Sequence, residues 1–289
     1  MKRPRVTIGV PVRNGGDLFA TAMRSIINQS EQDLEIIISD NASDDGTGEF
    51  AKTIAESDRR IHYFLQRSPL SAYDNFRFVL SKANGQYFMW AAHDDSRDLD
   101  FIAKLADELD QDPAAVLAFG DVQIITAADP VGRPYPFDFS TTGLGRLDRL
   151  IKTSSMQCFH IYGLWRLPVI QRVPYAFCPW WPDLPIMMAA ASFGPFRYVS
   201  GTRFYYYEVV KQNLDRVKYQ DYSRRFDLPS AVLQLVGATY SSCSLVANRW
   251  VGCFAAGLVL WKQARGLPGH LYRKMIRLSL PCMGKPFNR

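Results

Sequence analysis

The sequence has few cysteines, and no two of them stand in a Cys-x-x-Cys spacing. The five cysteines are widely separated, and none lies in the first half of the chain. An odd number of scattered cysteines excludes a disulfide scaffold and a zinc finger, and it fits a reducing compartment. We therefore expect a cytoplasmic protein.

The sequence also lacks a hydrophobic run long enough to cross a membrane. The longest clean apolar run is residues 250–261. As a helix it would extend about 18 Å, against a hydrocarbon core of about 30 Å. The apolar stretch at residues 6–12 is too short for the core of a signal peptide and has no small-residue cleavage site. We expect neither a membrane span nor a targeting segment.

Acidic residues are missing from the last part of the chain. After Asp227 there are none, so residues 228–289 carry a charge of +8, and the total of +6 leaves −2 for residues 1–227. The cations alternate with aromatic and aliphatic side chains, which is typical of an amphipathic helix on an anionic membrane surface. A packed helix or an oligomer contact is the alternative. No recognition motif accompanies the charge, so we expect no nucleic-acid partner.

What the sequence does have is the pattern of a folded α/β protein. It is 47% hydrophobic and 13% aromatic, which excludes disorder. Between the strands, apolar residues recur at helical spacing. This alternation predicts a mostly parallel sheet with right-handed crossovers, covered by helices. The predicted strands are residues 6–12, 34–39, 61–65, 87–91, and 116–119 continuing into 122–125.

Beyond residue 126 the pattern loosens. Residues 127–145 are rich in Pro, Gly, Asp and Thr, which predicts a mobile loop. Residues 146–207 form short aromatic segments that periodicity does not place. Helical character returns over residues 230–261.

Polar side chains directly follow the predicted strands, where an open parallel sheet binds its ligands. Asp40 follows the second strand, Arg67 the third, and Asp94 and Asp95 the fourth. Two adjacent carboxylates repel each other and lose hydration, and a cation such as Mg²⁺ or Mn²⁺ offsets that cost. The pattern therefore favours a metal and phosphate site at this edge.

Each of these residues also has a structural interpretation. Asp95 or Ser96 could cap the following helix, and Arg67 could be an ordinary surface charge. Asp40 could stabilise the polar turn that it begins, in which we expect Asp45 to be the N-cap of the next helix. The spacing alone leaves these alternatives open.

Four motifs occur in a characteristic order along the chain. They are Val6–Asn14, Ser25–Ser30, Glu35–Thr47, and Ala83–Tyr87 ahead of His93-Asp94-Asp95. Together they resemble the family 2 glycosyltransferases of the GT-A fold, over roughly residues 4–125. The resemblance implies an inverting transfer of a sugar from a nucleotide-diphospho-sugar donor to a glycan or lipid-linked acceptor, assisted by divalent Mn or Mg. It also suggests a place in cell-envelope polysaccharide synthesis.

The resemblance further implies roles for single residues. Asp94 would contact the ribose, and Asp95 would hold the metal ion. His93 stands where the family often has an acid, which is a departure from its D-x-D motif. The residues implied to bind the nucleotide sugar are Pro11, Val12 and Arg13 at the base pocket, Asp40 at the base, Arg67 near the base or diphosphate, and Asp94.

Inversion requires a carboxylate that takes the proton of the acceptor hydroxyl. The best match to the family's position for this base is Asp183, and a turn residue after Pro182 is the alternative. Trp180 and Trp181 could contact the acceptor or pack in the core.

The domain division that follows places a GT-A domain at residues 1–227 and a helical, basic extension at residues 228–289. Within the first, residues 1–126 would bind the nucleotide sugar and residues 127–227 the acceptor. The extension would attach the cytoplasmic enzyme to the inner face of the cell membrane.

Two other function classes remain open. A sugar-phosphate nucleotidyltransferase has a similar sheet, but it would need a Gly-rich basic loop after the first strand, and residues 13–16 match that only weakly. A noncatalytic binding protein on the same fold is the second. A dinucleotide oxidoreductase is disfavoured because no G-x-G-x-x-G follows the first strand.

Overall fold

The structure, a computed structural model, describes residues 3–135, 139–156, 158–174, 183–208 and 228–264. Its N-terminal half has the strands and helices that the periodicity predicts, with ends that differ by a residue or two. These elements are β1 (Val6–Val12), α1 (Gly16–Ile27), β2 (Leu34–Asp40), α2 (Thr47–Ser57), β3 (Ile61–Leu65), α3 (Ala72–Ser81), β4 (Tyr87–Trp90) and α4 (Phe101–Gln111).

The remaining elements are strands of very different lengths and several helices. They are β5 (Ser96–Arg97), which precedes α4, then β6 (Leu117–Thr126), β7 (Asp129–Pro134), α5 (Arg146–Thr153), the 3₁₀ helix η1 (Cys158–Tyr162), β8 (Leu164–Arg166), α6 (Leu167–Ile170), α7 (Asp183–Phe193), β9 (Phe196–Tyr207), α9 (Leu228–Val246) and α10 (Arg249–Ala264).

The strands of the described residues form one mixed sheet in the order β3-β2-β1-β4-β8-β6-β9-β5, with β7 paired to β6. Strands β1, β2, β3, β4, β6 and β9 run in one direction, and β5, β7 and β8 run against them. The prediction of a mostly parallel sheet is confirmed.

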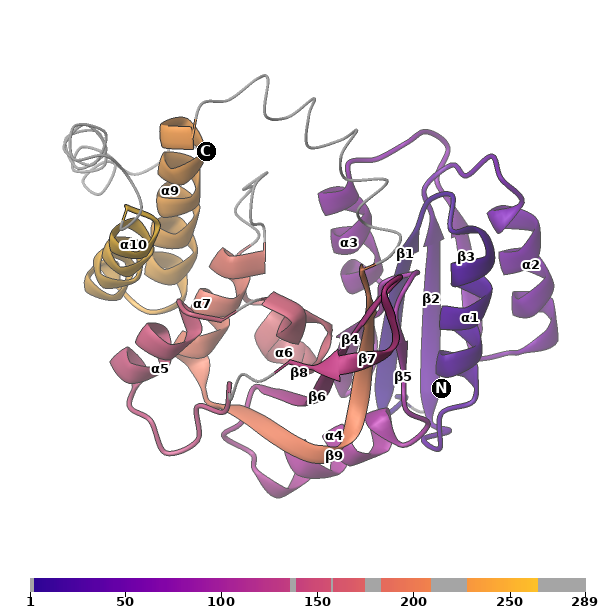
Figure 1. Ribbon diagram of the computed structural model, residues 1–289, viewed down its shortest axis with the longest axis horizontal. Helices are drawn as coiled ribbons and strands as arrows, with labels where there is room; N and C mark the ends of the chain where they lie inside the picture. Colours follow the sequence, from indigo (N-terminus) through magenta and orange to yellow (C-terminus); the bar gives the residue numbers. More distant parts are fainter. Residues whose placement is uncertain (1–2, 136–138, 157, 175–182, 209–227, 265–289) are drawn as a thin grey trace. The chain divides into compact units, whose positions relative to one another are not determined.

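The helices cover both faces of this sheet. The chain moves outward from β1 to β2 to β3 and then returns to β4 on the other side of β1. Right-handed crossovers therefore place α1 and α2 on one face and α3 on the opposite face, as Figure 1 shows. Every residue of β1 is buried, as expected for a central strand covered on both sides.

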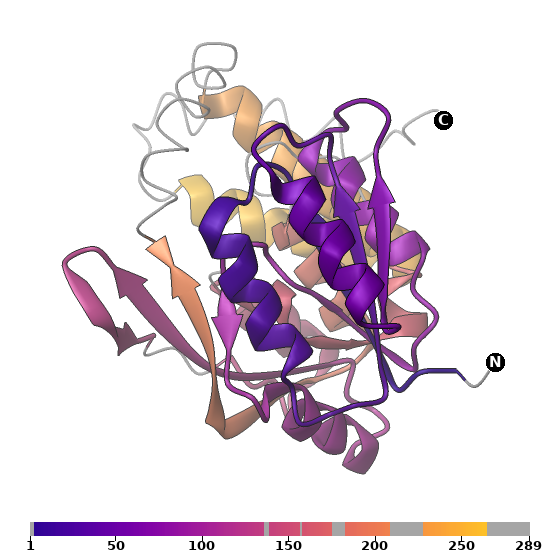
Figure 2. The ribbon, with the colours of Figure 1, turned by 90° about the vertical axis from the view of Figure 1, so that its right-hand side faces the viewer.

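The predicted loop over residues 127–145 is wrong in its first part, because Asp129–Pro134 forms β7 and pairs antiparallel with β6. Figure 2 shows this hairpin beside β9. Its sequence contains two prolines and a glycine, so strand propensity does not predict it. The side-chain amide nitrogen of Gln123, Nε2, donates hydrogen bonds to the backbone carbonyls of Val131 (3.3 Å) and Gly132 (2.8 Å), and these bonds support the hairpin.

The chain divides into two compact units. One holds the whole sheet with α1–α4 and α6, and the other holds α5, α7, α9 and α10. In the second unit α9 packs against both α7 and α10. These two units are defined by which residues pack together, and they do not test the functional domains. The domain boundary expected after residue 227 therefore stays a prediction. Among the described residues, no helix is both long and apolar enough to cross a bilayer.

Candidate active site

The carboxyl ends of β1 and β2 lie level with each other at one edge of the sheet. The parallel register pairs Pro11 with Ser39 and Val12 with Asp40. Pro11 and Val12 are buried, whereas Arg13, the next residue, is exposed. The structure therefore brings together the residues expected at the base pocket, and their binding role stays a prediction.

Asp40 is a buried carboxylate that holds the loop after β2. It is 1% exposed. Its Oδ1 accepts a 3.0 Å hydrogen bond from the Ser43 N–H, and its Oδ2 accepts one of 2.9 Å from the Tyr63 hydroxyl. Burial, together with the neighbouring Asp40, raises the pKa of Tyr63 and keeps this hydroxyl a donor. Asp40 thus stabilises its turn and keeps further lone pairs for a ligand.

Helix α2 passes close to the Asp40 carboxylate because residue 48 has no side chain. A Cβ added at Gly48 would lie 2.9 Å from Asp40 Oδ2 and 3.2 Å from the Tyr63 hydroxyl. Any other residue there would push against this hydrogen-bonded pair.

The predicted helix cap at Asp45 is wrong by one residue. The N-cap of α2 is Gly46, whose φ of 90° lies in the left-handed region that glycine adopts readily. The Asp45 carboxylate instead accepts hydrogen bonds from the Thr47 N–H (3.1 Å) and from the Gly16 N–H at the start of α1 (3.2 Å). Asp45 therefore links the N-termini of α1 and α2, beside the carboxyl ends of β1 and β2.

Asp94 and Asp95 follow β4 and are both buried. Asp95 is fully buried, and Asp94 is 9% exposed. Oδ1 of Asp95 accepts a hydrogen bond of 3.0 Å from the Tyr207 N–H at the end of β9. His93, just before them, is half-buried. The acidic pair is thus attached to two strands of the sheet.

The alternative in which Asp95 or Ser96 caps a helix is wrong. Ser96 and Arg97 form β5, which pairs antiparallel with β9, and α4 begins only at Phe101 after its N-cap Asp100. The short strand between β4 and α4 holds the acidic pair against β9.

Sequence reasoning missed Arg97, the most unusual side chain of this region. It is 3% exposed, and within the described part of the chain none of its three guanidinium nitrogens has a hydrogen-bond partner. Burial lowers the pKa of Arg97 to about 10, and the charge of Asp95 opposes that shift. The guanidinium therefore balances the charge of the buried Asp95. The sequence could have indicated this pair, because Asp95 and Arg97 are two positions apart and residues two apart in an extended chain face the same side.

Arg67 lies on the loop that follows β3, and it is exposed. That loop is tied to the end of β2, because the Gln66 N–H donates to the Asp40 carbonyl (2.9 Å) and the Leu70 N–H donates to Oδ1 of Asn41 (2.6 Å). The loop thus brings Arg67 to the edge of the sheet where Asp40 lies. Its exposure also fits the alternative that Arg67 is an ordinary surface charge.

Asp94 and Asp95 are the residues that the sequence predicts at a metal site. Among the described residues, no group of three or more His, Cys, Asp or Glu side chains could hold a metal. Mg²⁺, however, commonly binds one or two carboxylates and completes its shell with substrate phosphate oxygens and water. Metal binding by Asp94 and Asp95 stays a prediction.

Asp183 is the first residue of α7, in the second compact unit. The interpretation as a turn residue is therefore wrong. Burial raises the pKa of Asp183 to about 6. A carboxyl with this pKa is ionised at neutral pH and is a stronger proton acceptor than an exposed aspartate. Trp180 and Trp181 lie outside the described residues.

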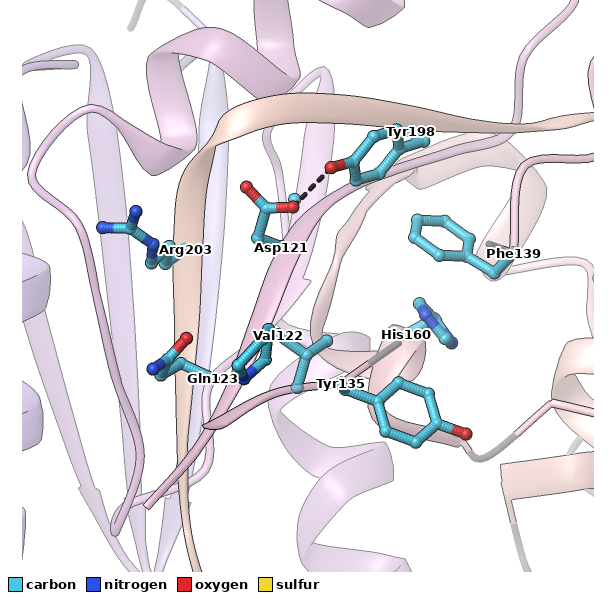
Figure 3. Close-up of a pocket in the computed structure, with 10 residues that line it drawn as sticks. Asp121, Val122, Gln123, Tyr135, Phe139, His160, Tyr198 and Arg203 are labelled. Atoms are coloured by element: carbon cyan, nitrogen blue, oxygen red, sulfur yellow. Dashed lines mark hydrogen bonds between the residues drawn. The ribbon is translucent and has the colours of Figure 1, made fainter. Parts of the chain in front are cut away.

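A cavity of about 340 Å³ lies in the sheet unit, away from the ends of β1 and β2. It opens among β6, β9, the residue after β7, and η1 (Figure 3). Aromatic and charged side chains line it, among them Asp121, Tyr135, Phe139, His160, Tyr198 and Arg203. The sequence contained no spacing signal for this cavity.

The fold and the buried carboxylates agree with the resemblance to family 2 glycosyltransferases, and comparison with known proteins tests that resemblance directly. The family model "Glycosyl transferase family 2" matches residues 7–163, more than half of the chain. The chain therefore belongs to glycosyl transferase family 2.

Two curated relatives illustrate the range of similar proteins. The GalNAc(5)-diNAcBac-PP-undecaprenol beta-1,3-glucosyltransferase of Campylobacter jejuni is 36% identical over 93 residues, which cover 32% of this chain and 30% of that enzyme. The putative teichuronic acid biosynthesis glycosyltransferase TuaG of Bacillus subtilis is 28% identical over 102 residues, covering 35% and 40%. The chain thus matches well under half the length of these relatives.

Solved structures share the fold over nearly the whole chain. S. aureus TarS 1–349 in complex with UDP-GlcNAc has a TM-score of 0.60 at 12% identity, covering 96% of this chain and 92% of that one. The mannosyltransferase PcManGT from Pyrobaculum calidifontis, in complex with GDP-Man and Mn²⁺, has a TM-score of 0.52 at 16% identity, covering 98% and 83%. At these identities the likeness shows the fold alone, and this is the GT-A fold.

Proposed function

We propose that the protein is an inverting glycosyltransferase that moves a sugar from a nucleotide-diphospho-sugar donor to a glycan or lipid-linked acceptor in cell-envelope polysaccharide synthesis. The observation that carries the proposal is a pair of buried carboxylates beside the two strands that flank β1: Asp40 is the last residue of β2, and Asp95 follows β4. Burying two acids at one edge of a sheet is costly unless ligands or partners compensate them.

The donor would bind across this edge. Pro11, Val12 and Arg13 would line the base pocket with Asp40, which keeps lone pairs for a base or ribose donor group. Arg67, on the loop tied to Asp40, would reach the base or diphosphate, and Asp94 would contact the ribose. The support for these roles is the β1–β2 register and the loop hydrogen bonds.

Asp95, with Asp94 beside it, would hold a divalent metal, Mn²⁺ or Mg²⁺. When bound, the metal supplies positive charge for the departing nucleoside diphosphate. Mn²⁺ is present in the structures of PcManGT and of GalNAc-T7. The protein's own contribution is to hold Asp95 in place through the Tyr207 N–H and to keep Arg97 as its counter-charge.

Asp183 would be the catalytic base. Inversion requires the acceptor hydroxyl oxygen to attack the anomeric carbon as the bond to the diphosphate breaks, with the hydroxyl proton passing to a carboxylate. The pKa of about 6 that burial gives Asp183 suits this role at neutral pH.

The names of the relatives support the class of acceptor. One is named for a PP-undecaprenol acceptor, and another for teichuronic acid biosynthesis. Membership of a glycosyl transferase family favours sugar transfer over nucleotidyl transfer and over a noncatalytic binding role.

The α9–α10 hairpin would contact an anionic membrane surface. Leu245 is 76% exposed and Trp250 is 85% exposed, close to each other in sequence around the turn between the two helices. Phe254 and Leu258, one and two turns further along α10, are partly exposed. A helix that is apolar on its outer face as well as its packed face is typical of membrane contact, and the basic composition after Asp227 complements anionic lipids.

A donor screen tests the proposal. Binding and slow hydrolysis of UDP-, GDP- and dTDP-sugars are measured with and without Mn²⁺, for the full chain and for Asp95→Ala, with the exposed Asp17→Ala as control. We expect one nucleotide class to bind, Mn²⁺ to strengthen binding, and only Asp95→Ala to remove the metal effect. Binding that is indifferent to both Mn²⁺ and Asp95→Ala would overturn the metal-assisted mechanism.

A further inference from the structure

Strands β6 and β9 run parallel, but they separate in the middle of their pairing. The register passes from Phe119–Tyr198 to Asp121–Arg203, so β9 contains three more residues than β6 over this interval. Such a bulge bends its strand and redirects the side chains around it. The cavity of about 340 Å³ lies here, lined by residues on both sides of the bulge.

The bulge is held firmly in this form. The Asp121 carboxylate accepts hydrogen bonds from the Tyr198 hydroxyl and from the Gly201 N–H, the latter at 3.1 Å. Gly201 has a φ of 77°, which glycine adopts at little cost. Around it, the Lys104 ammonium donates to the Gly201 carbonyl (2.7 Å), and the Arg203 N–H donates to Oδ2 of Asp98 (2.9 Å). The cavity is therefore preformed.

Two kinds of surface line this cavity. Tyr135 and Tyr198 are partly exposed aromatic rings of the lining, and behind them Phe139 and His160 are buried and pack on each other, with ring centroids 3.8 Å apart (Figure 3). Asp121 and Arg203 add a carboxylate and a guanidinium from the neighbouring strands. The lining thus combines aromatic rings with charged groups that both donate and accept hydrogen bonds.

This combination matches a sugar ring. A pyranose has C–H faces that pack on aromatic rings and hydroxyls on its rim that hydrogen-bond to carboxylates and guanidinium groups. A purely apolar ligand would leave Asp121 and Arg203 desolvated without new partners, and an anion would meet the Asp121 charge. The volume lies at the small end of ligand pockets, which suits a single ring.

We propose that this cavity binds one sugar unit of a saccharide acceptor, outside the donor site. The inference rests on the proposed glycosyl transfer. Strand β9 leads from the cavity toward the donor site, because Arg203 precedes Tyr207, the residue bonded to Asp95, by four positions. Four extended residues span about 13 Å. A unit bound in the cavity belongs to a part of the acceptor remote from the reacting hydroxyl.

Saturation-transfer NMR with the full chain tests the binding. The probes are free glucose, galactose, rhamnose, N-acetylglucosamine and N-acetylgalactosamine, each with and without saturating UDP. We expect at least one sugar to bind in a way that UDP does not displace. Arg203→Ala and Tyr135→Ala should weaken this binding about tenfold or more, the scale expected for loss of one good contact. Arg133→Ala, which removes a guanidinium from β7 outside the cavity, is the matched control.

The proposal is overturned if no sugar binds, if UDP displaces the sugar, or if binding survives both variants. A third variant, Asp121→Asn, keeps the side-chain shape, and it should weaken sugar binding even if Tyr135→Ala proves unstable. Donor hydrolysis in the absence of acceptor is measured on the same samples. The rate of donor hydrolysis should be unchanged in all these variants. If the wild type does not hydrolyse any donor, that result would contradict the proposed glycosyl transfer and not the proposal that the cavity binds a sugar.

Discussion

The backbone N–H of Tyr207 donates a 3.0 Å hydrogen bond to Oδ1 of Asp95, so the end of β9 fixes the buried acid that follows β4. These residues are 112 positions apart in the chain. The bond orients one oxygen of this carboxylate. It explains how a fully buried aspartate can have a defined position at the edge of the sheet.

Asp95→Asn separates the charge of this residue from its structural bond, because the amide oxygen can still accept the Tyr207 N–H. We expect a folded protein whose sugar transfer falls about 10²- to 10³-fold, as for removal of a group that stabilises transition-state charge. Transfer rates and Mn²⁺-dependent UDP binding, with Asp17→Asn as the control, measure this. Wild-type transfer by Asp95→Asn would contradict the assignment.

Gly48→Ala tests the contact between α2 and Asp40. In a helix, alanine is more favourable than glycine by about 1 kcal/mol. At Gly257 in α10, where a Cβ meets nothing within 4 Å, the same change should raise the free energy of unfolding by about that amount. At Gly48 the new Cβ would press on Asp40 Oδ2, so we expect that gain to be lost and donor binding to weaken.

Urea unfolding and titration with the nucleotide sugar identified in the donor screen measure both variants. Equal stabilisation by the two substitutions, with unchanged donor binding, would show that Asp40 has no fixed position that the ligand needs.

Asp183 should give the pH profile of transfer an acidic limb. A base acts in its ionised form, so kcat/KM should fall as the pH drops below about 6, the pKa that burial gives this carboxyl. Asp183→Asn should abolish transfer while donor binding persists. Transfer that survives in Asp183→Asn would remove only the base assignment.

The same substitution also has a predicted effect on stability. A carboxyl whose pKa is raised by folding favours the folded state when protonated, and it costs stability as the pH rises through the folded pKa. Above about pH 6, Asp183→Asn should therefore be more stable than the wild type, and the difference should vanish at low pH. Thermal unfolding at pH 4 and pH 8 measures this and shows that lost activity is not lost folding.

Leu245→Ser combined with Trp250→Ser tests the membrane contact. Burying one large apolar side chain contributes about 1.5–3 kcal/mol, so the double variant should bind phosphatidylglycerol vesicles at least tenfold more weakly. Val131→Ser, which changes an 82% exposed residue on β7, is the control. Equal sedimentation of all three proteins with the vesicles would contradict a role for the hairpin.

Point substitutions suit this test better than truncation after residue 227. Helix α9 packs against α7, the helix that begins with Asp183. Removing α9 would therefore expose α7 and disturb the proposed base together with the membrane contact.

The strands and helices up to residue 111, except β5, could be predicted because their signals are local. β1 and β2 are mostly apolar and rich in β-branched residues, α1 shows apolar residues at helical spacing, and each run ends at a polar or glycine-rich turn. The positions of Asp40, Asp94 and Asp95 after strands followed directly, as did the adjacency of Pro11, Val12 and Asp40.

The errors lie where pairing with another strand, rather than the segment's own pattern, decides the structure. β7 has no apolar alternation and exists because β6 offers it hydrogen bonds. The two-residue strand β5 is too short to have a pattern, and its pairing with β9 replaced the helix cap expected at Asp95 or Ser96. The same pairing buries Arg97, for which the sequence analysis made no prediction.

The sequence by itself determined the family, the order of the first strands and helices, and the carboxylates at the strand ends, because these depend on periodicity and on residues close together in the chain. Only the tertiary structure decided which carboxylates are buried, what holds them, and that the β9 bulge opens a cavity beside Asp121. Those properties arise from pairings of β9 with β5 and β6 across about a hundred residues, and no local pattern records such pairings.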